Sequence, residues 1–197
     1  GIRAATDPDA VVKFNSKAID SIHRIDQMIQ DLLDAHRISA GQTLPLKIEK
    51  CDVAAFLKKI IEDLTTVYGA RFSLNVDGKL EGQWDVNYMR RALENLCTNA
   101  IKYGKDGTLV RVSASPSRIS GEGLSLSVHN QGEPLAKEDH QRLFDIFSRG
   151  RNAHVHGMHG WGIGLTIVKG IAEAHGGSVE VESDARGTIF SLELPVR

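Results

Sequence analysis

The sequence predicts an α+β fold in which helices pack on a largely antiparallel sheet, with one long helix before it. Apolar residues recur in steps of three and four from about Asp9 to Ser39, which is typical of a long amphipathic helix. Later segments, such as residues 124–130 and 187–195, alternate apolar and polar residues as strands do. Segments with helical spacing lie between them, so we expect a two-layer α/β sandwich after the long helix.

The long helix has a clear beginning and end. Asp7-Pro8 suits a first turn, and Gly41 suits a helix terminus. Its apolar stripe consists of Val11, Phe14, Ala18, Ile22, Ile25, Ile29 and Leu32. A helix of this length exceeds what one domain face requires, so we expect a partner helix, as in a coiled coil or four-helix bundle. The alternative is an ordinary amphipathic helix packed on its own domain.

The remaining elements follow from the same periodicities. A linker is expected at residues 41–47. The expected helices span residues 53–68, 90–103 and 165–175. Strands are expected at residues 47–51, 71–76, near 83, 109–114 and 124–130, with two more ending at Val196.

One predicted helix carries an unusual polar face. Asn95, Asn99 and Lys102 are spaced i, i+4 and i+7, so they share one side. An Asn side-chain oxygen is a neutral hard ligand that suits Mg²⁺, and a Lys can meet phosphate charge. The alternative is a polar face exposed to solvent.

A glycine-rich turn precedes the apolar helix that begins at Leu165. Gly160, Gly162 and Gly164 allow backbone N–H groups to approach an anion closely, and a helix N-terminus favours phosphate. The turn lacks the preceding strand of a Rossmann fingerprint and the Gly-Lys-Ser/Thr of a Walker loop. The alternative is a flexible surface loop.

The order of these motifs resembles the catalytic, ATP-binding domain of sensor histidine kinases, of the gyrase, Hsp90, histidine kinase and MutL superfamily. The resemblance covers residues 48–197 and implies a Bergerat-type ATP-binding fold. The matching boxes are Asn95–Tyr103 (N box), Asn130–Pro134 (first glycine box), Phe144–Phe147 (F box), Gly160–Gly164 (second glycine box) and the closing strand Gly187–Phe190.

The resemblance implies ATP and Mg²⁺ as ligands and assigns roles to matching residues. Asn99 corresponds to the metal ligand, and Asn95 occupies the phosphate-proximal position. Lys102 and Tyr103 correspond to contacts on the phosphate and ribose side. The remaining implied nucleotide contacts are Asn130, Gly132, Phe147, Arg149, Gly160, Gly162, Gly164, Leu165 and Thr188.

The first glycine box departs from the family pattern. Asn130 stands where the family usually has an Asp that receives the adenine amino group. An amide oxygen still accepts that hydrogen bond, but the charge-assisted part, about 1 kcal/mol, is lost. Glu133 and Pro134 also stiffen this turn. The affinity and the base selectivity of the pocket are therefore left open.

Residues 24–38 are similar to the second helix of the histidine kinase dimerisation domain. This similarity implies two domains, residues 1–41 as a partial dimerisation helix and residues 48–197 as the catalytic domain. It also implies a homodimer and a response regulator as partners. The acceptor motif of the first dimerisation helix does not occur, and neither His23 nor His36 has its context. We therefore expect part of a longer kinase, which binds ATP–Mg²⁺ but does not phosphorylate itself alone. A naturally truncated protein is the alternative.

Composition sets the remaining expectations. A net charge of −1 gives no reason to expect nucleic-acid binding. Two cysteines, Cys51 and Cys97, suggest no disulfide framework, so a reducing, cytoplasmic setting is expected. No stretch is long and apolar enough to cross a bilayer, and membrane attachment of a longer parent is left open.

The expected function is transfer of the γ-phosphoryl group of ATP to a histidine on a dimerisation helix outside this chain. Two alternatives remain. One is a non-catalytic relative with a decayed nucleotide pocket, which Asn130 and Glu133 favour and Asn99 and Lys102 disfavour. The other is a serine kinase of the anti-sigma type, which the long first helix disfavours.

Overall fold

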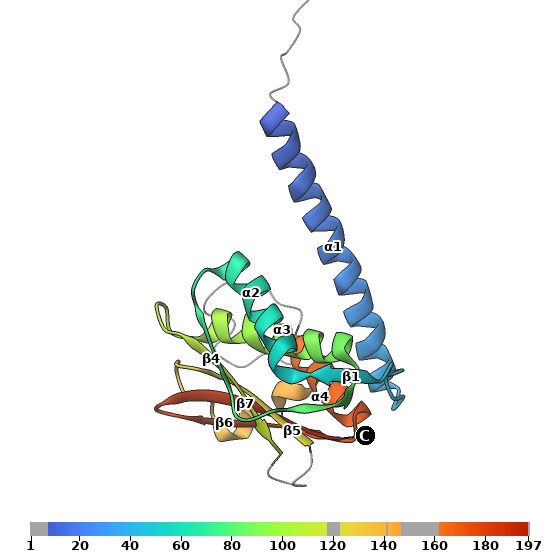
Figure 1. Ribbon diagram of the computed structural model, residues 1–197, viewed down its shortest axis with the longest axis vertical. Coiled ribbons are helices and arrows are strands. Elements are labelled where there is room, and N and C mark those ends of the chain that lie inside the picture. Colours follow the sequence, from blue (N-terminus) through green and yellow to red (C-terminus); the bar gives the residue numbers. More distant parts are fainter. Residues whose placement is uncertain (1–7, 118–122, 141, 147–161, 197) are drawn as a thin grey trace, which may run out of the picture.

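A computed structural model describes residues 8–117, 123–140, 142–146 and 162–196, except for several side chains in the first half of the first helix. The larger of two sheets is covered on one face by helices, and helix α1 (Pro8–Ser39) projects away from this body (Figure 1). The predicted two-layer α+β fold with a long leading helix is confirmed. No helix in the described part of the chain is long and apolar enough to cross a membrane.

The main sheet has five strands in the order β2-β4-β5-β7-β6. They are β2 (Phe72–Val76), β4 (Val110–Pro116), β5 (Gly123–Asn130), β6 (Ser178–Asp184) and β7 (Gly187–Pro195). All neighbours are antiparallel except β2 and β4, which are parallel because helix α3 (Val86–Tyr103) lies in the crossover between them. Strands β1 (Glu49–Asp52) and β3 (Glu81–Trp84) form a separate antiparallel pair.

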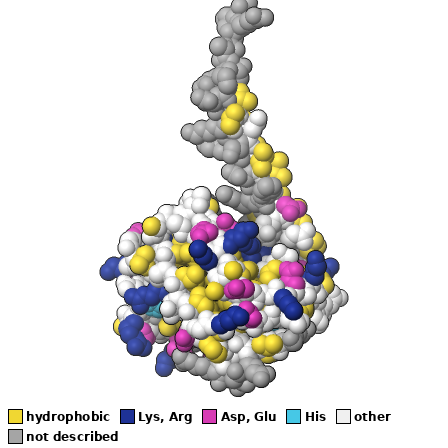
Figure 2. Space-filling view, viewed as in Figure 1, with side chains coloured by type: hydrophobic (Ala, Val, Ile, Leu, Met, Phe, Trp, Pro, Cys, Tyr) yellow, Lys and Arg dark blue, Asp and Glu magenta, His cyan; other side chains and the backbone are white. Residues whose placement is uncertain are grey.

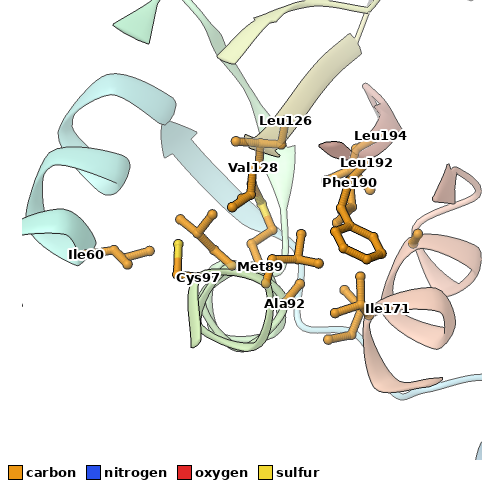
Figure 3. Packing of buried hydrophobic residues seen from close by; sticks show 14 of the residues in the cluster. Ile60, Met89, Ala92, Cys97, Leu126, Val128, Ile171, Phe190, Leu192 and Leu194 are labelled. Carbon is orange, nitrogen blue, oxygen red and sulfur yellow. The ribbon is translucent and has the colours of Figure 1, made fainter. Parts of the chain in front are cut away.

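The core lies between the sheet and the helices. Strand β5 alternates strictly, so Leu124, Leu126 and Val128 point toward the helices. Met89 of α3 and Ile171 of α4 (Gly164–Ala174) meet them from the other side (Figure 3). Helix α2 (Val53–Tyr68), whose bounds match the prediction, packs beside α3 through Val53, Leu57, Ile60 and Leu64.

Helix α3 begins one turn earlier than the sequence periodicity predicts. We expected a start at Arg90, but the helix begins at Val86 because Asp85 caps it. The Asp85 carboxylate accepts hydrogen bonds from the backbone N–H groups of Asn87 and Tyr88, each at 3.0 Å. The first turn therefore forms at Val86, and Met89, which is 1% exposed, continues the apolar side of the helix into that turn.

Asp85 also joins two distant segments to the start of α3. Its second carboxylate oxygen accepts from the backbone N–H of Lys47 at 2.7 Å, which anchors the end of the linker after α1. Its own N–H donates to Nε2 of His175, 3.0 Å away, at the C-terminus of α4. His175 is buried, and its Nδ1 donates to the carbonyl of Ile171 at 2.8 Å, so the ring is neutral.

The segment around the F box forms no α-helix within the described residues. Its charge run at residues 137–139, followed by apolar residues from 143 onward, is a pattern typical of the start of a short amphipathic helix. The described residues instead form two short 3₁₀ turns, η1 (Lys137–Asp139) and η2 (Arg142–Phe144). Between residues 135 and 142 the only apolar side chains are those of Leu135 and Ala136, so no apolar stripe at helical spacing supports an α-helix there.

Helix α1 is attached to the body only through its last turns. Asp34 and Ala35 are 4% and 2% exposed, whereas the large apolar side chains described nearer its start are exposed. Gly41, at a φ of +71°, ends the helix as predicted, and the N–H of Gln42 reaches back to the carbonyl of Arg37. The helix is therefore anchored at one end and unsupported over most of its length.

We predict that Asp85→Ala lowers the free energy of unfolding by about 3 kcal/mol, because it removes a helix cap and a buried, charge-assisted bond to Lys47. Urea denaturation followed by circular dichroism measures this loss. Asp52→Ala is the matched control, since Asp52 caps α2 at an exposed position through Ala55 alone and its loss costs about 1 kcal/mol. Equal losses for the two variants would contradict the role given to Asp85.

Candidate functional site

Helix α3 presents two carboxamides beside the core. Its buried side contains Leu93, Leu96 and Cys97, while Asn95 and Asn99 lie half-buried on the neighbouring side, one turn apart. Within the described residues, neither carboxamide makes a hydrogen bond, so both keep their donors and acceptors available for a ligand. Half-buried polar groups without partners are costly unless a ligand or water satisfies them.

The N-terminus of α4 meets Asn95. A Cβ added at Gly164, the first residue of α4, would lie 2.8 Å from Oδ1 of Asn95, so glycine here allows the carboxamide to approach the helix without turning aside. Ile163, at the N-cap, provides no side-chain hydrogen bond to the first turn. Gly162 has a φ of +68°, in the left-handed region. Unpaired N–H groups and the helix dipole at this end favour an anion beside Asn95.

A second group of predicted residues lies at the other end of α3. Strand alternation places Asn130, 6% exposed, on the helix-facing side of the sheet, and Thr188 is its cross-strand neighbour on β7. A Cβ at Gly132 would lie 2.9 Å from the carbonyl oxygen of Tyr103, so this glycine allows the turn to pack against the end of α3. The structure thus brings Asn130, Gly132, Tyr103 and Thr188 together.

Ser183 supports this second group, and sequence reasoning did not identify it. The hydroxyls of Ser183 and Thr188 share a hydrogen bond of 2.7 Å. The Ser183 hydroxyl also accepts from the backbone N–H of Leu135 at 3.0 Å. A serine that pairs with Thr188 across the β6–β7 hairpin was in principle predictable from the hairpin register, but the link to Leu135 depends on tertiary structure.

The η2 turn is hydrogen-bonded to the first turn of α4. The hydroxyl of Thr166 donates to the carbonyl of Phe144 at 3.0 Å, and the Phe144 ring packs edge-on against Phe190, 6.3 Å between centroids. Leu165 lies half-buried at the start of α4. Of the predicted site residues, Phe147, Arg149 and Gly160 lie outside the described residues.

The charged groups near the site are few. Lys102 is exposed in the last turn of α3, and within the described residues it has no carboxylate partner. Burial raises the pKa of Glu94, and its ion pair with Arg90 partly offsets that effect. Burial, with a smaller effect of Glu94, raises the pKa of Cys97 to about 12, so Cys97 is a core thiol.

The donor set fits a metal that is held together with a phosphate. Among the described residues, no cluster of three or more His, Cys, Asp or Glu side chains could hold a metal ion. A closed protein cage is therefore absent from this part of the chain. One or two neutral amide oxygens, such as that of Asn99, match Mg²⁺, which keeps several waters and takes its other ligands from phosphates.

Comparisons with known proteins agree with this arrangement. The family described as "Histidine kinase-, DNA gyrase B-, and HSP90-like ATPase" matches residues 84–197. The sensor-like histidine kinase SenX3 of Mycolicibacterium smegmatis is 30% identical over 98% of this chain and 50% of its own length. The sensor protein SrrB of Staphylococcus aureus is 30% identical over 96% of this chain and 33% of its own length. The chain thus spans half or less of these relatives.

Solved structures share the fold. Full-length ShkA, in a complex with AMPPNP, superposes with a TM-score of 0.74 at 24% identity, covering 93% of this chain and 38% of that one. The histidine kinase AdeS of Acinetobacter baumannii gives a TM-score of 0.69 at 21% identity, covering 98% of this chain and 88% of that one. The expected resemblance to the ATP-binding domain of sensor histidine kinases is confirmed. Since the family match covers more than half of its residues, the chain belongs to the histidine kinase-, DNA gyrase B- and HSP90-like ATPase family.

Proposed function

We propose that this chain is the ATP-binding catalytic part of a sensor histidine kinase, and that it transfers the γ-phosphoryl group of ATP to a histidine outside these residues. One observation carries the proposal. Asn95 lies against Gly164 at the N-terminus of α4, and Asn99 follows one turn later on α3. Within the described residues neither carboxamide makes a hydrogen bond and no side chain caps α4, so together they suit a polyphosphate with its metal. The family and its sensor kinase relatives support the same reaction.

Each residue group has a separate task in this proposal. Asn99 would hold Mg²⁺, which neutralises phosphate charge when bound. The N–H groups at the start of α4 and the ammonium of Lys102 bind the phosphates and orient the γ-phosphoryl group. Asn95, held against Gly164, contacts the phosphate end. Phosphoryl transfer depends mainly on such positioning and charge stabilisation, so the residues need no strong base.

The buried group around Asn130 would bind adenine. Its Nδ2 donates to the carbonyl of Gln131 at 3.3 Å, so Oδ1 is the atom that would accept a hydrogen bond from an exocyclic amine. Thr188, held by Ser183, lies beside it. The pocket therefore retains an acceptor for the adenine amino group without the charge of an aspartate.

The long helix α1 would pair with a second copy of the chain. Its exposed apolar stripe, with Ile22, Ile25, Ile29 and Leu32 between 51% and 62% exposed, has the three-and-four spacing of a helix bundle seam. Apolar side chains lie along the projecting helix in Figure 2. A homodimer through α1, and a response regulator as the phosphoryl acceptor that follows, are supported by the sensor kinase relatives.

We expect Asn99→Ala to weaken binding of ATP in the presence of Mg²⁺ by about tenfold or more, and to abolish the gain in affinity that Mg²⁺ gives. Isothermal titration calorimetry with a non-hydrolysable ATP analogue, with Mg²⁺ or with EDTA, measures both. Asn87→Ala, at an exposed position of the same helix, is the control and should bind as the unaltered chain does. If the unaltered chain binds no nucleotide, the decayed-pocket alternative is correct.

We expect Asn130→Asp to strengthen ATP binding by about fivefold, because a carboxylate accepts the hydrogen bond of the adenine amino group more strongly than an amide. The same calorimetry measures the change. Gln131→Glu adds the same charge at the neighbouring exposed position and should leave the affinity within about twofold. Weaker binding by Asn130→Asp would show that this side chain does not accept from the base.

We expect the chain to form dimers that the double substitution Ile25→Glu and Ile29→Glu dissociates, because charges replace apolar contacts in the seam. Sedimentation velocity over a range of concentrations measures the dissociation constant, which should rise by about a hundredfold or more. Gln30→Glu, exposed on the same helix, should change it little. A monomer at all concentrations would contradict pairing through α1.

A further inference from the structure

The last turns of α1 carry two carboxylates that bind one arginine of α3. Nη1 of Arg91 lies 2.6 Å from Oδ2 of Asp34, and Nη2 lies 2.7 Å from Oδ1 of Asp31. These partners are 57 and 60 residues away in sequence. We call Asp31, Asp34 and Arg91 together the clasp. It is a contact between the long helix and the helix that carries Asn95 and Asn99.

The clasp is sheltered from water. The side chains of Arg91 and Asp34 are 17% and 6% exposed. The ring of Tyr88 lies beneath the guanidinium, 5.2 Å from its centroid to Cζ, and its hydroxyl is 3.5 Å from Asp34. Burial alone would lower the pKa of Arg91, but its bonds to Asp31 and Asp34 outweigh this and raise it. The guanidinium is therefore charged, and its planar fork meets the two carboxylates in a defined orientation.

An apolar contact lies beside the clasp. Ile38, one turn after Asp34, packs on Gly170 of α4, where an added Cβ would overlap its side chain. Ala35 is buried at the same interface. The end of α1 is thus fitted against both helices that form the phosphate end of the site. Figure 1 shows that the remainder of α1 extends beyond the body without support from it.

We propose that the clasp is a positioning device, which fixes the direction in which α1 leaves the catalytic body and so the place of the nucleotide site relative to α1. Arg91 lies one turn before Asn95 on the same side of α3, so the guanidinium that holds α1 is rigidly connected to the phosphate end. The consequence for phosphoryl transfer rests on the proposed function, whereas the orientation itself does not.

An ionic contact suits this task better than a further apolar one. Buried ion pairs add little net stability compared with apolar replacements, but they tolerate only one geometry and fail when one partner is removed. Apolar packing of Ile38 alone would permit α1 to slide or rotate. The Gly41 turn after α1 is the point about which the helix would move once the clasp opens.

Distance measurements between spin labels on α1 and the sheet test the proposal. Cysteines introduced at Asn15 of α1 and Glu180 of β6 are exposed and take the label. The native Cys51 and Cys97 are buried, and burial raises their pKa values to about 11 and about 12, so they react slowly at neutral pH. Dilution with unlabelled chain removes distances between copies. We expect one narrow distance distribution from pulsed electron paramagnetic resonance.

Arg91→Ala should broaden this distribution at least about twofold, because about 24 Å of helix between Asn15 and Asp31 amplifies a small change of angle. Arg90→Ala is the matched control, since Arg90 pairs with Asp63 and Glu94 inside the body and should leave the distribution unchanged. Arg91→Lys should give an intermediate width, because one ammonium cannot hold both carboxylates as a fork. An unchanged distribution in Arg91→Ala would overturn the proposal.

Two further measurements keep the outcome decisive. If circular dichroism shows that Arg91→Ala is unfolded, Asp31→Asn decides, because Asp31 is the more exposed carboxylate and its loss leaves Asp34 paired. A broader distribution in that variant supports the clasp, and an unchanged one overturns it. The ATP affinity of Arg91→Lys should stay within about twofold of the unaltered chain. Absence of ATP binding by the unaltered chain would refute the proposed function and leave the distance result standing.

Discussion

The carboxylate of Asp85 is the contact on which the arrangement of this molecule depends. It is buried, yet three backbone N–H groups satisfy it, two from the first turn of α3 and one from Lys47. Its own N–H holds His175 at the end of α4. One residue therefore fixes the start of α3, the end of α4 and the linker that follows α1. A buried charge without these partners would be strongly destabilising, so the three segments are held together or not at all.

The contact between Asp85 at the start of α3 and His175 at the end of α4 also positions the candidate site, which lies farther along α3 and at the N-terminus of α4. Helices α3 and α4 are rigid over their lengths, so the joint at Asp85 and His175 also sets how Asn95 approaches Gly164. Apart from the exposed Lys102, the described part of the candidate site is built from glycine contacts and neutral carboxamides rather than from fixed charges. Under the proposed function, a triphosphate and its metal would bring their own charges, and oriented amides and N–H groups would stabilise them without the cost of burying an unpaired ion beforehand.

The sequence predicted most of the elements because their signals are local. Helix α2 has a regular apolar spacing and matched its predicted bounds, and the glycine boxes identified the family before any contact was known. The start of α3 was missed because periodicity was followed into Arg90, although Asp85 is a typical N-cap residue five positions earlier. A search for caps as well as periodicity would have found it.

Other features could not be predicted, because they join residues that no local pattern connects. The parallel pairing of β2 and β4 depends on where the α3 crossover packs. The bond between Ser183 and Leu135 and the ion pairs of Arg91 span 48 or more residues. Arg90 and Arg91 are indistinguishable in sequence, yet one binds inside the body and the other binds α1. Only the fold shows which of the two reaches the long helix.

Two parts of α1, its exposed apolar stripe and its last turns, meet two different requirements, association with a partner helix and a defined orientation. Its exposed apolar stripe can bury area against a partner helix, which supplies free energy but tolerates small shifts along the seam. Its last turns use charge and close packing on glycine, which supply little net free energy but define an angle. Because the stripe and the clasp lie on one rigid helix, any rotation imposed on the seam must either move the nucleotide site with it or break the contact of Arg91.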